Sequence, residues 1–244
     1  MTVETSTRRV QRVRHETRRR QLQVARVVTL SPGMVRVTLA GDDLAGFISA
    51  SFDDHVKLIF DGSGPQPVMR DYTPRRHDAA TNELDIEFAL HGDGPAAAWA
   101  TQARPGQTLT VGGPRGSFIV PLDYAWHLLI GDDTALPAIA RRLEELPAGT
   151  RAIVRLAVAP ADRRPLPSAA AVDLQWFDDE AALIAAVRAL ALPAGEGYAW
   201  CAGEAAAMAE LRSVLVQDKG HDRHAIRAAA YWKRGAIAHH ENLE

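Results

Sequence analysis

The sequence predicts two domains, an antiparallel β-barrel followed by an α/β domain with a parallel sheet. In residues 21–123, short apolar runs alternate with charged residues and are separated by turn sequences. From residue 124 to residue 244, compact apolar runs alternate with segments of helical periodicity. Many short, closely spaced strands are typical of a small closed or nearly closed barrel, whereas alternating strands and helices predict parallel pairing with helices on the faces.

The expected barrel strands have apolar residues at every second position. These strands are VARVVTL, MVRVTLA, HVKLIF, ELDIEFAL and TLTVGG, and the turn sequences between them include SPG, GDD, DGSGP and TNE. One helix, GPAAAWATQA, interrupts the series, and Pro95 is well placed in its first turn. We expect the barrel to end near the sequence PLDYAW.

The elements expected in the second domain alternate in kind. WHLLIG, RAIVRLAVA, GYAWCAG and, as the last strand, HAIRAAAYWKRG read as strands. DDTALPAIARRLEEL, DEAALIAAVRAL and EAAAMAELRSVLVQD read as helices. The junctions IGDDTA and CAGEAA each carry a glycine, and ligands of open α/β sheets bind beyond the carboxyl ends of the strands. The crevice between the two domains is therefore the expected ligand site.

Composition limits the partners of this chain. A formal net charge of -2 argues against a general affinity for nucleic acid or anionic membranes, and no apolar run approaches the ~20 residues of a membrane span. Residues 1–20 form a basic arm that we expect to be solvated and flexible, although it also suits phosphate or an acidic partner. The arm lacks the apolar stretch of a secretory signal, and the single cysteine, Cys201, excludes an internal disulfide. We expect a cytoplasmic protein.

The stretch RDYTPRR, at residues 70–76, combines an aromatic ring, a hydroxyl and three guanidinium groups. On an extended strand Arg70 and Tyr72 project to the same side, and Pro74 ends or bends the strand. With Thr73 as a hydrogen-bonding group, these side chains suit an isoalloxazine ring joined to a pyrophosphate. The alternative is a charged edge strand with an ordinary buried tyrosine.

Two glycine-rich loops follow this stretch. HGDGPAAAWA places glycines directly before a helix of small residues, where free N–H groups bind phosphate. VGGPRGSF adds Arg115 and Ser117. Neither loop has a dinucleotide-binding or Walker pattern, so each is a weak signal by itself.

The order of these motifs resembles the siderophore-interacting protein family. The pieces are DDHVKL, RDYTPRR, HGDGPAAAWA, GPRGSF, GDDTALPAIARRLEEL, WCAGEA and YWKRG, and they extend from about Val24 to Gly235. Members of that family are FAD-dependent ferric-siderophore reductases whose architecture is related to that of ferredoxin reductases. The resemblance therefore implies FAD on the barrel and a nicotinamide-binding-like second domain.

The resemblance also implies roles for particular residues. The implied FAD contacts, with the two glycine-loop residues included, are Arg70, Tyr72, Thr73, Arg75, His91, Gly94, Ala96, Ala97, Arg115 and Ser117. The implied NAD(P)H site comprises Asp132, Thr134, Ala135, Cys201, Gly203 and Glu204. Lys57, Lys233 and Arg234 are the implied contacts to an anionic ferric siderophore. Asp132 also fits an ordinary helix cap, Cys201 a buried strand-end residue, and the three cations a solvated surface.

The implied reaction is electron transfer. FAD takes electrons from NADPH, NADH or ferredoxin and passes them singly to chelated ferric iron, without a general acid or base. Alternatives are a reductase of the same architecture with another acceptor and a non-catalytic siderophore-binding module. The histidines, among them His221 and His224, form no metal-binding pattern, so we expect no dedicated metal site and iron that arrives chelated.

Overall fold

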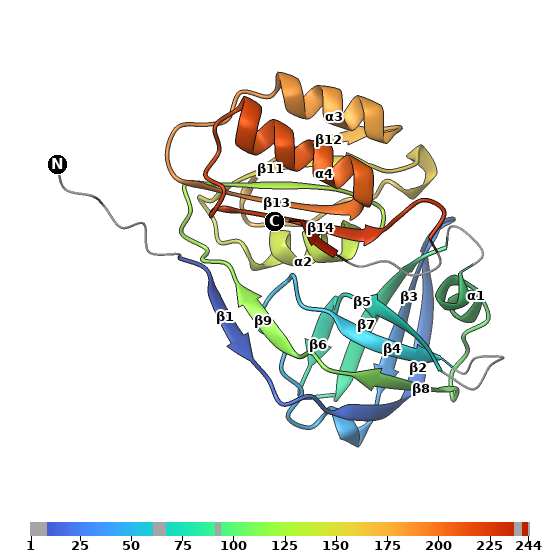
Figure 1. Cartoon of the computed structure of the whole chain (residues 1–244). Helices are drawn as coiled ribbons and strands as arrows, with labels where there is room; N and C mark the ends of the chain where they lie inside the picture. Colours follow the sequence, from blue (N-terminus) through green and yellow to red (C-terminus); the bar gives the residue numbers. More distant parts are fainter. Residues whose placement is uncertain (1–8, 61–66, 91–93, 237–240, 244) are drawn as a thin grey trace.

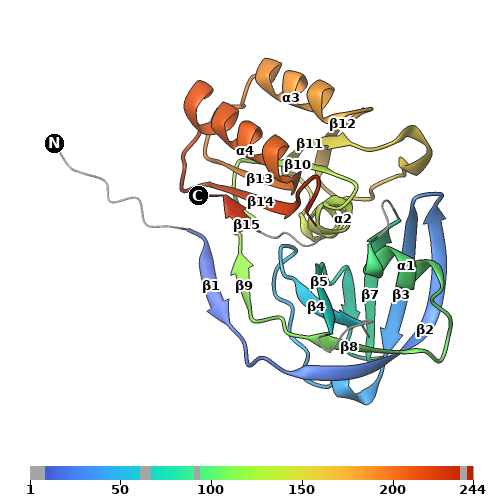
Figure 2. The same ribbon diagram turned by 45° about the vertical axis from the view of Figure 1, so that its right-hand side comes forward.

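A computed structural model of the chain describes residues 9–60, 67–90, 94–236 and 241–243. It contains an antiparallel sheet in the first half and a mainly parallel sheet in the second half. Figures 1 and 2 show the α/β domain lying over the open side of the curled barrel sheet. The expected fold class, a β-barrel followed by an α/β domain, is confirmed. Within the described residues, no helix is both long enough and apolar enough to cross a membrane.

The barrel sheet has seven strands in the described residues, and its neighbouring strands pair antiparallel. In spatial order they are β5 (Val68–Tyr72), β4 (Val56–Phe60), β8 (Thr108–Gly112), β2 (Arg19–Ser31), β3 (Met34–Ala40), β7 (Glu83–Ala89) and β6 (Arg76–Asp78). The outermost strands β5 and β6 are consecutive in the chain and are joined by residues 73–75, so the two sheet edges are drawn together. Among the described residues no ladder joins β5 to β6, and the barrel is thus nearly closed.

Two short helices accompany the barrel, η1 (Asp42–Leu44) and α1 (Pro95–Thr101). Helix α1 begins after Gly94 with Pro95 in its first turn, as expected. Its Ala96 and Ala100 join the barrel core, which is filled by the inward-facing residues of the strands. The apolar residues that recur at every second position of these strands are therefore the residues that form the barrel core.

The α/β sheet has six strands. In spatial order they are β12 (Ala171–Phe177), β11 (Arg151–Ala157), β10 (Trp126–Asp132), β13 (Gly197–Glu204), β14 (Ile226–Trp232) and β15 (Glu241–Leu243). The first five are parallel, whereas β15 pairs antiparallel with β14. The expectation that β14 is the last strand was wrong. Strand β15 lacks an apolar pattern because it pairs through its backbone at the edge of the sheet.

The helices of this domain cover both faces of the sheet. Helices α3 (Glu180–Ala189) and α4 (Ala205–Ser213) lie on the outer face, and α2 (Leu136–Glu145) lies between the sheet and the barrel (Figures 1 and 2). A short helix η2 (Pro160–Asp162) follows β11, and the π-helix η3 (Val214–Asp218) continues α4. The chain reverses strand order between β10 and β13, which is where α/β sheets of this topology bind ligands.

Part of the predicted flexible arm is a strand. Strand β1 (Gln11–Arg14) pairs antiparallel with β9 (Gly116–Ile119) in a two-stranded ribbon. All four β1 side chains are exposed, so hydrophobic periodicity carries no sign of the pairing. Just before β1, the Arg9 guanidinium donates to Glu196 at 2.7 Å and stacks over the Tyr124 ring at 4.4 Å.

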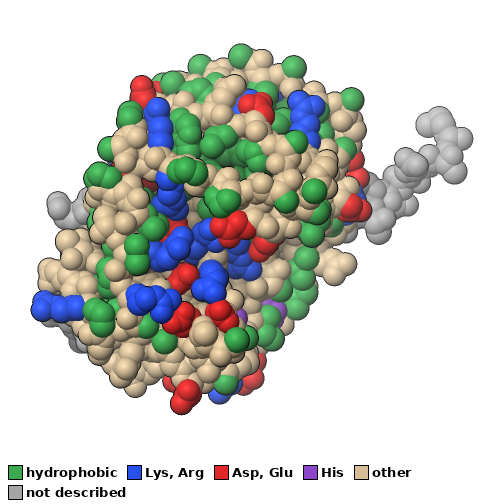
Figure 3. Space-filling model, turned by 180° about the vertical axis from the view of Figure 1, so that it is seen from behind, with side chains coloured by type: hydrophobic (Ala, Val, Ile, Leu, Met, Phe, Trp, Pro, Cys, Tyr) green, Lys and Arg blue, Asp and Glu red, His purple; other side chains and the backbone are tan. Residues whose placement is uncertain are grey.

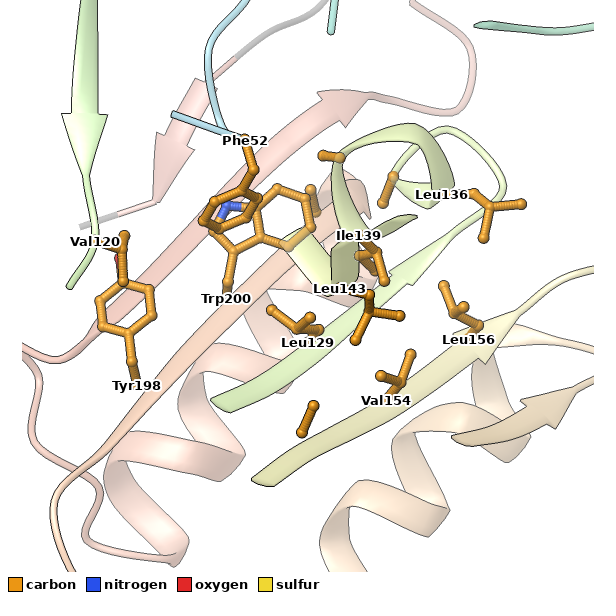
Figure 4. Close-up of a cluster of buried hydrophobic side chains, with 14 of the residues drawn as sticks. Phe52, Val120, Leu129, Leu136, Ile139, Leu143, Val154, Leu156, Tyr198 and Trp200 are labelled. Carbon is orange, nitrogen blue, oxygen red and sulfur yellow. The ribbon is translucent and has the colours of Figure 1, made fainter. Parts of the chain in front are cut away.

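The two domains share a hydrophobic core. Phe52 of the barrel domain packs on Trp200 of β13 with 5.5 Å between ring centroids, and Ile139 and Leu143 of α2 belong to the same cluster (Figure 4). The Trp200 indole nitrogen also donates to the buried Asp53 carboxylate at 2.9 Å. Apolar packing and buried polar contacts therefore hold the barrel against the α/β sheet.

Candidate functional site

A cavity of about 500 Å³ lies at the junction of the two domains. Its lining comprises Lys57, Met69, Arg70, Asp71, Tyr72, Thr73, Glu87, Ala89, Gly94, Ala96 and Ala97 from the barrel domain, and Asp133, Thr134, Pro137, Tyr231, Trp232, Lys233 and Ala236 from the α/β domain. We call this space the junction cavity. It contains most of RDYTPRR together with the end of β14.

The aromatic wall of the junction cavity is Tyr72, at the end of β5. Its half-buried ring packs on Phe88 with 4.5 Å between centroids and also lines the cavity. Burial raises the pKa of the Tyr72 hydroxyl, so the side chain stays neutral. A ring fixed in this way is suited to stack on a flat ligand.

Arg70 and Thr73 flank this ring. One Arg70 guanidinium nitrogen donates to the Met69 carbonyl at 2.8 Å, and the side chain lines the cavity. The Thr73 hydroxyl hydrogen-bonds with Tyr231 of β14 and thereby links the two domains at the cavity wall. A threonine hydroxyl has one donor and two acceptor sites, so this bond leaves Thr73 capacity for a ligand.

The start of helix α1 forms a third part of the wall. Gly94, Ala96 and Ala97 line the cavity, and among the described residues no side chain caps this helix start. Trp99 anchors the helix, because its ring lies 5.7 Å from both Phe60 and Phe88. His91, the other contact expected here, lies outside the described residues.

Lys57 faces the cavity from β4, opposite Asp71 of β5 in the strand register. The Lys57 ammonium group donates to both Asp71 carboxylate oxygens, at 2.8 and 3.1 Å. The expected cation is therefore present at the site, and it is half of an ion pair. The sequence analysis did not assign Asp71, although its position between Arg70 and Tyr72 made it the cross-strand neighbour of Lys57.

Fewer of the expected residues reach the cavity from the α/β domain. Thr134 and Lys233 line it, together with Asp133 and Trp232, whereas Arg234 does not belong to the described lining. The Arg234 side chain is 75% exposed and lies 3.3 Å from Glu180. The structure therefore separates the two expected cations of YWKRG.

Asp132 ends β10 as a buried support for the cavity wall. Its carboxylate accepts hydrogen bonds from the Thr134 and Glu204 backbone N–H groups, at 2.9 and 3.1 Å. It also accepts from the Thr134 hydroxyl and, at 2.8 Å, from the Trp232 indole. Burial and the neighbouring charge of Asp133 raise the pKa of Asp132 to about 6. Asp132 therefore holds two wall residues, Thr134 and Trp232, in place.

The other expected NAD(P)H residues build the scaffold around Asp132. Gly203 has φ +152°, and a Cβ there would lie 2.5 Å from an Asp132 carboxylate oxygen, so the position requires glycine. The Glu204 carboxylate caps α4 by accepting from Ala206 N–H at 2.6 Å. Ala135 is completely buried. Cys201 is buried among the residues that pack against α3 and α4, and burial raises its pKa to about 12.

Three expected flavin contacts lie outside the described cavity lining, namely Arg75, Arg115 and Ser117. The buried Arg75 guanidinium pairs with Glu144 of α2, with one nitrogen–oxygen distance of 2.8 Å, and lies 3.5 Å from Glu87. Seen from behind, basic and acidic side chains are intermixed across the middle of the molecule (Figure 3). Arg75 is therefore a junction residue, although the sequence places it beside the flavin-binding motif.

Ser117 is occupied by a hydrogen-bond network inside the barrel domain. Its hydroxyl donates to Asp54 at 2.8 Å, contacts His15 at 2.8 Å and accepts from the Ala50 N–H at 3.2 Å. Arg115 is exposed and accepts a backbone hydrogen bond from His15 at its carbonyl. The second glycine loop thus fastens β1 to β9 in the described structure.

The junction cavity suits a flat, phosphate-bearing ligand next to a second, charged ligand. It offers the Tyr72 ring, the Arg70 guanidinium, the α1 backbone and Lys57 on the barrel wall, with Lys233 on the α/β wall. No group of three His, Cys, Asp or Glu side chains among the described residues is arranged to hold a metal ion. The wall groups can bind and orient ligands.

Comparisons with known proteins match both domains. Residues 124–235 match the family model described as siderophore-interacting protein, and residues 23–64 and 61–118 match the siderophore-interacting FAD-binding domain. An NADPH-dependent ferric-chelate reductase of Escherichia coli is 39% identical over 91% of this chain and 96% of its own length. A ferric vibriobactin reductase of Vibrio cholerae is 32% identical over 91% and 93%.

A solved structure supports the same relationship. The siderophore utilization protein from T. fusca superimposes with a TM-score of 0.87 at 33% identity, covering 96% of this chain and 98% of that protein. The matches include the barrel and the α/β domain. The chain belongs to the siderophore-interacting protein family.

Proposed function

We propose that this protein is an FAD-dependent reductase that takes electrons from NADPH and reduces ferric iron held by a siderophore. The observation that carries the proposal is the junction cavity, where Arg70, Tyr72 and Thr73 face the end of β14. The names of two relatives, an NADPH-dependent ferric-chelate reductase and a ferric vibriobactin reductase, support the same activity. We propose residues 21–123 and 124–244 as the limits of the two domains.

The residues of the barrel wall fit FAD. Tyr72 would stack on the isoalloxazine ring, Thr73 would hydrogen-bond its edge, and Arg70 would neutralise the pyrophosphate. The backbone at Gly94, Ala96 and Ala97 would lie beside the phosphates. When bound, FAD converts the two-electron donation of a nicotinamide into the one-electron steps that ferric iron requires.

The α/β wall would receive the electron donor and the chelate. Thr134 and Trp232, both held by Asp132, would orient the donor toward the barrel wall. NADPH is our choice because the Escherichia coli relative is named for it, with NADH and reduced ferredoxin as alternatives. We propose the cytoplasm as the location, because NADPH is available there as a reductant.

Lys57 and Lys233 would bind the ferric chelate beside the flavin. Oxygen donors hold ferric iron more tightly than ferrous iron because the ferric ion is smaller and more highly charged. Reduction therefore releases iron from the chelate. The lysines contribute by holding the chelate within electron-transfer distance of the flavin.

Anaerobic reduction of the FAD-loaded protein tests the proposal. NADPH, NADH and reduced ferredoxin are added separately while the visible absorbance of oxidised flavin is followed, and a panel of ferric chelates is then added with a ferrous trap. We expect NADPH to bleach the flavin and a ferric chelate to restore its colour. If none of the donors bleaches the flavin, a non-catalytic siderophore-binding module is the better description.

Paired charge reversal tests the substrate side. The variant Lys57→Glu with Lys233→Glu should retain bound flavin and lose the reduction of anionic ferric chelates. If reduction of every chelate survives with the flavin bound, the two lysines are not the substrate contacts. A reductase of the same architecture with another acceptor then becomes the better assignment.

A further inference from the structure

We propose that Asp71 selects the substrate by its charge, so that the junction cavity favours ferric chelates of low net charge over strongly anionic ones. A ferric tris-hydroxamate, which is neutral, represents the favoured class. A ferric tris-catecholate, which carries three negative charges, represents the disfavoured class. This inference rests on the proposed function, because it concerns the substrate of the same cavity.

The ion pair of Lys57 and Asp71 is built into the barrel wall. The two residues are cross-strand partners on β4 and β5, and both line the cavity. The ammonium group lies 2.8 and 3.1 Å from the two carboxylate oxygens. The side chains remain 39% and 20% exposed, so a ligand in the cavity meets the pair directly. Whether the pair stays closed or opens toward the ligand, its two charges sum to zero.

The opposite wall repeats this balance. Lys233 and Asp133 both line the cavity from the α/β domain and again contribute one positive and one negative charge. The remaining acidic lining residue, Glu87, has a fully buried side chain whose carboxylate contacts Arg36, Arg75 and Arg164. The two lysines available to a chelate are therefore opposed by two aspartates among the described lining residues.

Two further arginines, Arg70 and Arg234, do not change this balance for the substrate, and Arg36, Arg75 and Arg164 are engaged by the buried Glu87. Arg70 would be engaged by the FAD pyrophosphate, which brings negative charge of its own. Arg234 does not line the described cavity, and it pairs with Glu180 at 3.3 Å. Apart from Arg70, the described lining residues would therefore offer a trianionic chelate no net positive charge to compensate it.

The charge of the ligand multiplies the effect of Asp71. Removing one negative charge from the wall changes the electrostatic energy of a trianionic ligand about three times as much as that of a monoanion, and leaves a neutral ligand almost unaffected. Asp71→Asn should therefore strengthen binding of the trianionic chelate by about tenfold and change binding of the neutral chelate by less than about threefold.

Equilibrium dialysis with gallium chelates tests this on the FAD-loaded protein. Gallium(III) tris-catecholate and tris-hydroxamate have the charges of the ferric complexes and accept no electrons, so binding is measured without turnover. The matched control is Glu83→Gln, which removes one negative charge from another cross-barrel ion pair, with Arg26. Glu83 is 18% exposed, close to the 20% of Asp71, and is not among the described lining residues.

The wild-type protein should bind the neutral chelate more tightly than the trianionic one. Asp71→Asn should change the ratio of the two affinities by about threefold or more in favour of the trianion, and Glu83→Gln by less. The inference is overturned if Asp71→Asn changes the affinity ratio by less than this. It is also overturned if the wild type binds the trianionic chelate more tightly than the neutral one. If Asp71→Asn does not fold, the wild-type preference alone decides. A protein that binds the gallium chelates but reduces none of the corresponding ferric chelates refutes the proposed function and leaves the charge preference to be judged separately.

Discussion

The two walls of the junction cavity use their polar side chains in opposite ways. On the barrel wall, the side chains of Arg70, Tyr72 and Lys57 line the cavity themselves. On the α/β wall, Asp132 and Glu204 are buried. The Asp132 carboxylate holds the lining residues Thr134 and Trp232, and the Glu204 carboxylate caps α4. The barrel wall thus offers binding groups, whereas most polar groups of the α/β wall are structural supports.

The difference follows from the two kinds of strand end. At the end of β5 the extended backbone points successive side chains to opposite sides, and residues 69–73 all line the cavity. At the ends of β10 and β13 the chain must turn at once into a helix, and free backbone N–H groups must be satisfied. The residues directly after these strands make that turn, and after β10 two of them, Asp133 and Thr134, line the cavity.

The largest expected effect concerns a buried ionisable group below the α/β wall, His127 of β10. Burial and nearby Arg142 lower its pKa to about 4. Between pH 6.5 and 4 the unfolded chain binds a proton on this ring that the folded protein does not, so stability falls as the pH falls. The free energy of unfolding falls by about 3 kcal/mol through this titration, and the His127→Gln variant should not show that fall.

Urea unfolding at several pH values measures this effect. Asp132, whose raised pKa is about 6, gives the opposite slope, because the folded protein takes up its proton first as the pH falls. The test is therefore the difference in the free energy of unfolding between the wild type and His127→Gln at each pH. Parallel stability curves for the two proteins would show that His127 does not titrate as a buried neutral group.

The next largest effect tests whether Arg75 belongs to the junction. Arg75→Ala removes the pairing with Glu144 of α2 and one of three arginines near Glu87. We expect the free energy of unfolding to fall by about 2 to 3 kcal/mol, because a buried charge-assisted contact is lost. Arg75→Lys, which keeps the charge, should lose less. If Arg75→Ala weakens FAD binding and leaves the free energy of unfolding unchanged, Arg75 contacts the flavin and does not stabilise the junction.

Tyr72→Ala tests the barrel wall directly. Loss of the ring should weaken FAD binding by about thirtyfold, or about 2 kcal/mol, because the stacking surface disappears. Tyr72→Phe keeps the ring and should bind FAD nearly as well as the wild type. A fluorescence titration with FAD measures both, and circular dichroism checks folding. Equal weakening in the two variants would mean that the hydroxyl, rather than the ring, makes the contact.

The smallest expected effect tests the support role of Asp132. Trp232→Phe removes one hydrogen-bond donor from its carboxylate and should raise its pKa further. At pH 8, where Asp132 is ionised, the variant should lose about 1 kcal/mol of stability, and at pH 5 the loss should be smaller. An equal loss at both pH values would mean that the indole contributes through packing alone.

Sequence patterns predicted the barrel wall better than the α/β wall. The RDYT motif pointed to Arg70, Tyr72 and Thr73, which all line the cavity, and the apolar runs located the strands of both cores. Strands β1 and β15 escaped notice because their pairing is through the backbone and few of their side chains are buried. Strand β12 was missed because its alternation places mostly half-buried residues at the sheet edge.

Two of the predicted flavin contacts, Arg75 and Ser117, lie outside the described cavity lining because of contacts between distant parts of the chain. Nothing near Arg75 in the sequence indicates that Glu144, on a helix of the other domain, will pair with it. Ser117 lies in a glycine loop that resembles a phosphate loop, yet its hydroxyl is taken by Asp54 and His15. Such partners are determined by tertiary packing, and local sequence carries no trace of them.

The ribbon of β1 and β9 has a practical consequence for dissecting the molecule. Arg9, at the beginning of the described chain, pairs with Glu196 and stacks on Tyr124, both of which belong to the second half. Separating the two halves of the sequence would therefore also remove these noncovalent contacts. A fragment or a domain-exchange chimera should therefore keep the segment that contains Arg9 together with Glu196 and Tyr124. Otherwise, equivalent contacts should be built into the chimera.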